Sequence, residues 1–217
     1  MNTELENLLI EYAKNTEDPK NNFNLGICYE SIGHTAPALS YFLRCAERTD
    51  DDLLAYEALI HGAICYQSQG GRDMTAKTLY QHAMLLLPER PEAYGLLSRF
   101  CREREQMQDA YIYADTGLRC LDNDHVPLQN DCEYQGKNGL LFDKAVSGWT
   151  WGKVDETVGI LYDLYKSPDV EYSNRSKKAL KEFGKWNGDE ISLNDLTDPQ
   201  IESLVNQLIA RSMVVKV

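Results

Sequence analysis

The chain contains 217 residues, of which 43% are hydrophobic and 26% are charged. These proportions predict a globular protein and exclude a disordered one. Its 34 acidic and 22 basic side chains give a formal net charge of −12, which argues against general binding to DNA, RNA or anionic lipid. No stretch of about 18 consecutive apolar residues is present, so we expect no membrane span. The acidic start of the chain does not resemble a signal peptide, and a cytoplasmic protein is therefore expected.

Helix and turn signals predict a first helix, then four helical hairpins, then two further helices. The hairpins are expected near residues 19–50, 53–88, 91–121 and 135–167. Together with the first helix they would form one repeat domain over residues 1–168. Residues 169–217 would form a helical C-terminal extension.

Capping residues indicate where several of these helices begin. Asp18 precedes Pro19, and proline suits the first turn of a helix. Aspartates 50–52 are expected to cap the next helix, because negative charge is favoured at its positive end. Thr35 and Ser173 are the predicted caps of two other helices.

A pattern of small and large residues recurs along the first 121 residues. Three copies begin near residues 19, 56 and 91, so their spacings are 37 and 35 residues. A period of this length indicates stacked helical hairpins. Small residues are expected where two helices touch, notably Gly26, Ala38, Ala63, Ala76 and Ala110.

These residues resemble a tetratricopeptide repeat protein. The positions that match best are Leu25, Gly26, Tyr29, Gly33, Ala38, Phe42, Ala63, Tyr66, Gly70, Ala76, Tyr80, Ala83 and Pro88. The resemblance covers residues 19–121 well and 135–167 loosely. It implies an all-α fold, a right-handed superhelix of antiparallel helix hairpins. The one β-prone segment, 213–217, is interpreted either as the first strand of a domain outside this chain or as a frayed terminus.

A narrower resemblance points to the helical segment attached to some family-2 glycosyltransferases. It is carried by Ala76, Leu79, Tyr80, Ala83, Met84, Leu87, Pro88, the runs 90–93, 102–104 and 110–114, and residues 134–156. In those proteins the sugar-transferring domain lies elsewhere in the polypeptide, and nothing in this chain resembles it. The implied role is therefore accessory.

The tetratricopeptide resemblance also implies a concave, partner-binding face on the first helix of each hairpin. Carried over by register, its main members are Lys20, Phe23, Ile27, Glu57, Ile60, Ile64, Arg99 and Arg102, with Glu30, Ser31, Gln67 and Ser68 at further positions. Binding energy would come from burying Phe23, Ile60 and Ile64 against a guest, provided that these side chains are exposed.

Two pairs of residues allow alternative interpretations. Arg99 and Arg102, on one helix face, either pair with an acidic partner or pair with nearby carboxylates of their own chain. Trp149 and Trp151 flank a predicted turn, where they either stack on a sugar or partner or pack the last hairpin against the third.

Catalytic and metal-binding patterns are weak. Asp122 and Asp124 have the spacing of a metal-binding pair in nucleotide-sugar transferases, but a helix-ending turn explains them better. His61 and Cys65 share metal-ligand spacing on one helical face, yet no second pair accompanies them. The six cysteines are expected to be reduced and structural. We therefore predict no catalytic residue, no metal and no cofactor.

The resulting hypothesis is a non-catalytic scaffold that binds a protein or peptide, which by the narrower resemblance could be a glycosyltransferase. The alternative hypothesis is a fragment or subunit of a glycosyltransferase that takes part directly in sugar transfer. Self-association through the amphipathic end helices is a third hypothesis.

Overall fold

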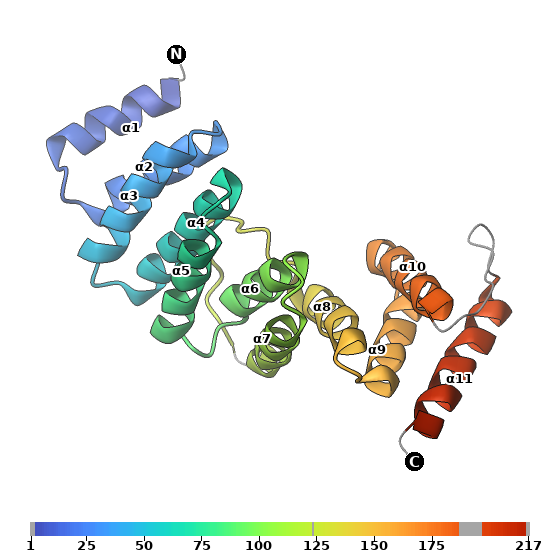
Figure 1. Ribbon diagram of the computed structural model, residues 1–217. Helices are drawn as coiled ribbons and strands as arrows, with labels where there is room; N and C mark the ends of the chain where they lie inside the picture. The colour runs from blue at the N-terminus through green and yellow to red at the C-terminus, as the bar shows by residue number, and fades with distance from the viewer. Residues whose placement is uncertain (1–2, 123, 187–196, 216–217) are drawn as a thin grey trace. The chain divides into compact units, whose positions relative to one another are not determined.

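The computed structural model describes residues 3–122, 124–186 and 197–215, which contain α-helices, one short 3-10 helix and no strand (Figure 1). In chain order the helices are α1 Thr3–Lys14, α2 Pro19–Ser31, α3 Thr35–Arg48, α4 Asp52–Gln69, α5 Asp73–Leu86, α6 Pro91–Glu103, α7 Met107–Arg119, the 3-10 helix Cys120–Asp122, α8 Gly136–Thr150, α9 Val154–Lys166, α10 Val170–Trp186 and α11 Asp198–Val215. No helix among these residues is both long enough and apolar enough to cross a bilayer.

The all-α fold class is confirmed, with helical hairpins formed by α2 with α3, α4 with α5, α6 with α7 and α8 with α9. The strand interpretation of the tail is wrong for the part that the structure describes, since α11 continues to Val215. Residues 216 and 217 lie outside the described residues.

The chain divides into two compact units. The first unit contains Met1–Tyr94 and Asp122–Glu133, and the second contains Gly95–Leu121 and Tyr134–Val217. The first unit therefore includes a segment that returns to it after α7. The boundary near residue 168 between a repeat domain and an extension stays a prediction.

The predicted helix start at Pro19 and the predicted cap among aspartates 50–52 are confirmed. The Asp18 carboxylate accepts hydrogen bonds from two backbone N–H groups at the start of α2. The Asp51 carboxylate does the same for α4. These bonds satisfy N–H groups that have no partner inside a helix.

The predicted caps Thr35 and Ser173 are wrong. Thr35 is the first residue of α3, and the residue before it makes no side-chain cap. In α10 the Asp169 carboxylate accepts the cap bonds, which starts the helix earlier than Ser173 would. The Ser173 hydroxyl donates instead to the backbone carbonyl of Tyr165 at 2.7 Å.

Small residues lie at helix contacts as predicted. All four of the predicted alanines, Ala38, Ala63, Ala76 and Ala110, are fully buried. A Cβ atom added to Gly26 would lie 2.5 Å from the buried Phe42 ring, so α2 approaches α3 more closely than alanine would permit. Close packing of this kind leaves little room for larger residues.

The turn after α6 has the same geometry as the turns after α2 and α8, but it lacks their glycine. In each turn, the N–H of the residue three after the helix end reaches back five residues to a carbonyl. The residue before that donor has a positive φ, which is 76° at Gly33, 76° at Gly152 and 59° at Glu105. This conformation is unfavourable for residues with a Cβ atom.

We expect Glu105→Gly to raise the free energy of unfolding of the second unit by about 0.5–1 kcal/mol, because glycine adopts a positive φ without steric cost. Urea unfolding followed by circular dichroism measures the change. Glu103→Gly is the matched control, since Glu103 is the last residue of α6 and has no positive φ, so glycine there should not raise the stability. A loss of stability in Glu105→Gly would contradict the strain assigned to this turn.

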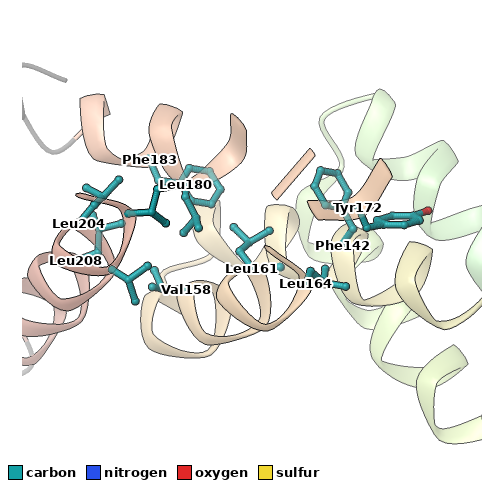
Figure 2. Close-up of a cluster of buried hydrophobic side chains, with 12 residues drawn as sticks. Phe142, Val158, Leu161, Leu164, Tyr172, Leu180, Phe183, Leu204 and Leu208 are labelled. Atoms are coloured by element: carbon teal, nitrogen blue, oxygen red, sulfur yellow. The ribbon is translucent and has the colours of Figure 1, made fainter. Parts of the chain in front are cut away.

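Buried side chains of α8, α9, α10 and α11 form one core cluster in the second unit, and Figure 2 shows those of α10 and α11 meeting the α9 row. Its members are Phe142, Ala145, Val158, Leu161, Leu164, Tyr172, Leu180, Phe183, Ile201, Leu204, Val205 and Leu208. The α8–α9 hairpin and the two helices after it therefore bury their apolar faces against one another.

Candidate interaction site

The predicted groove residues Phe23 and Ile60 are core residues. Their side chains are 1% and 0% exposed, respectively. The Phe23 ring packs edge-on against Phe42 of α3 and His61 of α4, with ring centroids 5.8 and 6.1 Å apart. This register position faces neighbouring helices, so neither side chain offers surface to a partner.

The other predicted groove residues of the first unit differ in exposure. Lys20 is exposed, whereas Ile27 and Ile64 are half-buried. Glu57 is 0% exposed, although it shares its register position with Lys20. The burial of this carboxylate has a specific cause in the segment that follows α7.

Glu57 binds an irregular segment of its own chain, residues 124–133, which we call the connecting segment. Its carboxylate accepts hydrogen bonds from the backbone N–H of Gln129 at 3.0 Å, from the backbone N–H of Asn130 at 2.6 Å and from the Asn130 side-chain amide at 3.1 Å. A buried carboxylate needs such donors to offset its loss of hydration. In Figure 1 the connecting segment runs beside α4 in yellow-green.

Arg90 holds the connecting segment at a second point. Its guanidinium donates to the backbone carbonyl of Val126 at 2.9 Å and makes a two-point contact with Glu92 at 2.5 and 3.2 Å. The Tyr56 hydroxyl also donates to Glu92 and accepts from the N–H of Ala93. A buried polar network therefore fixes the backbone of the connecting segment through main-chain groups.

A cleft of about 520 Å³ remains between the connecting segment and helices α2 and α4. Its lining comes from α2 and the turn after it, from the start of α3, from α4 and from the connecting segment, namely Glu30, Gly33, Thr35, His61, Ile64, Cys65, Ser68, Asp131, Cys132 and Glu133. We call it the α2–α4 cleft. Three of the predicted concave positions, Glu30, Ile64 and Ser68, meet in it.

Glu30 is the centre of the polar contacts in the α2–α4 cleft. Its carboxylate lies 2.7 Å from Nδ1 of the buried His61 and 3.9 Å from the Cys65 sulfur. Burial, followed by the Glu30 charge, raises the pKa of Cys65 to about 12, so the thiol stays protonated and is a poor nucleophile or metal ligand. No group of three metal-ligating side chains arranged for an ion is present among the described residues.

Comparison with solved structures gives high-probability matches over most of the chain. A thermophilic TPR protein of Thermus thermophilus matches with a TM-score of 0.55 and 17% identity, over 82% of this chain and 89% of that one. Nearly identical TPR-like repeats of a putative kinesin light chain of Podospora anserina match with a TM-score of 0.59 and 15% identity, over 92% and 98%. A chain of the APC/C Cut9–Hcn1 hetero-tetramer matches with a TM-score of 0.57 and 10% identity, over 96% of this chain and 39% of that one.

The chain has a tetratricopeptide-like fold. These identities are low, so they establish the fold of the repeats and not a partner. No protein-family model and no curated protein sequence matches the chain.

In the second unit of this tetratricopeptide-like fold, Arg102 pairs with a carboxylate of its own chain. Its Nε atom lies 2.6 Å from Oδ1 of Asp143, which is buried on α8. Burial raises the pKa of Asp143, and the positive charge of Arg102 opposes that rise. The pairing of Arg102 is thus within its own chain, as one of the two interpretations predicts, but its partner Asp143 lies 41 residues away in the sequence.

The two tryptophans that flank the turn after α8 also pack inside the second unit. Trp151 meets Tyr111 of α7 edge-on, with ring centroids 5.1 Å apart, as the packing interpretation predicts. Trp149 stacks on Phe183 of α10 at 4.0 Å, and not against the third hairpin. These two ring contacts account for the positions of Trp149 and Trp151 without a sugar ligand.

The aspartate pair at 122 and 124 does not lie at the end of a strand. Asp122 ends the short 3-10 helix, and Asp124 begins the connecting segment, while residue 123 lies outside the described residues. The sequence identified this stretch only as a polar loop. It missed that Asp131 and Glu133 reach a cleft beside α2, because their neighbours there lie far away in the sequence.

Proposed function

We propose that this chain is a non-catalytic scaffold whose first unit binds an extended segment of a partner protein at the α2–α4 cleft. The observation that carries the proposal is the connecting segment itself. The first unit already holds a stretch of irregular backbone on α4 through Glu57, and a cleft continues beside that stretch. Extended peptides that are recognised through main-chain groups are a common class of ligand.

The lining of the α2–α4 cleft suits a peptide better than a small substrate. Half-buried Ile64 supplies apolar surface, and the Thr35 and Ser68 hydroxyls lie on the same rim. Protein interfaces combine apolar contact with a polar rim in this way. Exposed Lys20 and half-buried Ile27 of α2 keep surface that would extend such a groove, and Arg99 remains a proposed contact on the second unit.

Ser68→Trp is expected to block the α2–α4 cleft and to abolish capture of a direct partner by the purified chain. Ser68 is exposed on α4, so a bulky side chain fills the cleft without entering the core. Affinity capture with the unaltered and substituted chains, followed by mass spectrometry, identifies proteins that are lost selectively. Ser40→Trp, at an exposed position of α3, is the matched control.

Circular dichroism should give the same helical signal for all three proteins. A partner that binds the Ser68→Trp chain as strongly as the unaltered chain would remove the α2–α4 cleft from the proposal. A partner that is lost equally from the Ser40→Trp chain would show a general effect of added tryptophan.

Association with a glycosyltransferase is a narrower proposal, and the sequence resemblance over residues 76–156 supports it. Under this proposal the partner, or a further part of the same polypeptide, carries the transferase. A captured partner of that class would support it, as would a transferase domain encoded in frame. Turnover of a nucleotide sugar by the isolated chain would instead support the direct role in sugar transfer.

A further inference from the structure

The negative charge of the chain is concentrated in one of its two units. The first unit has 18 acidic and 7 basic side chains, a formal charge of −11. The second unit has 16 acidic and 15 basic side chains, a formal charge of −1. The first unit therefore attracts cations far more strongly than the second does.

The α2–α4 cleft lies within this acidic unit and is lined by hydrogen-bond acceptors. Glu30, Asp131 and Glu133 contribute carboxylates from two sides, and no lysine or arginine lines the cleft. Asp131 also accepts the backbone N–H of Glu133 at 2.8 Å, which orders this part of the connecting segment. The Asp131 carboxylate is thus held in place by the fold, and the Glu30 carboxylate is held by its contact with His61.

His61 supplies an independent indication of a missing hydrogen-bond partner. Its side chain is 3% exposed and lines the α2–α4 cleft, and its Nε2 atom has no hydrogen-bond partner. The Nδ1 atom faces the Glu30 carboxylate, so Nε2 is the ring nitrogen that is left without a partner. A buried polar atom without a partner is uncommon and marks a place where a hydrogen-bond partner would be stabilising.

We propose that the α2–α4 cleft binds a lysine or arginine side chain of the extended partner segment. Carboxylates would accept charge-assisted hydrogen bonds from the cationic head, while Ile64 packs against its aliphatic stem. This inference rests on the proposed function and specifies the chemistry of the guest. The carboxylates that line the cleft favour a hydrogen-bond donor over an acidic or purely apolar side chain.

Fluorescence polarisation with labelled peptide pools tests the proposal. Each pool holds nonapeptides with random alanine, serine, glycine, threonine and leucine around one fixed central residue, which is arginine, lysine, citrulline, leucine or glutamate. Citrulline matches the shape of arginine without its charge. We expect the arginine or lysine pool to bind about tenfold more tightly than the citrulline pool, as one charged hydrogen bond is worth.

The double substitution Asp131→Asn with Glu133→Gln should remove most of that preference. The new amide oxygen at position 131 can still accept the bond from residue 133, so the connecting segment keeps its conformation. Glu47→Gln with Asp50→Asn removes the same charge from exposed positions of the first unit outside the cleft. This control should change binding less than twofold, because salt screens distant charges.

Equal binding of the arginine and citrulline pools overturns the inference. The inference is also overturned if the control variant Glu47→Gln with Asp50→Asn loses as much of the preference as the variant Asp131→Asn with Glu133→Gln. Tighter binding of the leucine or glutamate pool would leave peptide binding intact while removing the basic guest. Absence of binding by every pool at millimolar concentration would count against the proposed function as well.

Discussion

Replacing Glu57 with alanine is expected to detach the connecting segment from α4 and to lower the free energy of unfolding of the first unit by about 2–4 kcal/mol. The carboxylate is buried and accepts three hydrogen bonds. Hydrogen bonds to a charged group each contribute about 1.5–3 kcal/mol. The expected loss is smaller than their sum, because alanine also removes the cost of burying the charged carboxylate. The residue that holds the connecting segment therefore lies far from it in the sequence, although the two are in direct contact.

Hydrogen exchange of residues 126–133 is the decisive measurement. In Glu57→Ala these amides should lose protection, and the buried Cys132 thiol should react with a thiol reagent in the native protein. Glu57→Gln keeps one acceptor oxygen and should give an intermediate result. Glu47→Ala, an exposed change on α3, should leave exchange and thiol reactivity as they are. Unchanged protection of residues 126–133 in Glu57→Ala would show that other contacts hold the connecting segment.

The hairpins could be predicted from the sequence because their signals are local. Helical periodicity, turn glycines and buried alanines all act within about 37 residues, and the structure has helices where these signals indicate them. At α3 the structure has no side-chain cap, so the error at Thr35 is a helix that begins without one. At α10 both Asp169 and Ser173 can cap a helix, and the helix begins at the earlier of the two.

The groove could be predicted only in part, and the register shows why. Phe23 and Ile60 occupy the same position in successive repeats, and both are buried, because neighbouring helices cover that position. Ile27 and Ile64 share another position, and both are half-buried. The register of the repeat thus predicts the exposure of a side chain where only the neighbouring helices cover its position.

Lys20 and Glu57 show where register fails. They share a position, yet the lysine is exposed and the glutamate is buried beneath the connecting segment. Asp131 and Glu133 reach the α2–α4 cleft by the same return of the chain. A loop carries no periodicity from which its docking site can be inferred, so these residues required the structure.

Leu180→Ala is expected to cost about 2–5 kcal/mol in the second unit, since it removes a fully buried side chain and leaves a cavity. Leu180 belongs to α10, but its cluster includes Leu161 of α9 and Leu208 of α11 (Figure 2). The substitution should therefore reduce hydrogen-exchange protection in α9 as well as in α10. Ile112→Ala, at a half-exposed position of α7, should change stability by less than about 0.5 kcal/mol.

The same measurement tests whether residues 169–217 form a separate extension. If α10 and α11 were attached to an independently stable repeat domain, Leu180→Ala would reduce protection in α10 and leave α8 and α9 as they were. The shared cluster predicts the opposite, because Phe142, Val158 and Leu164 bury their apolar surface against the later helices. A cavity at Leu180 weakens contacts that all four helices share, so we expect them to lose protection together.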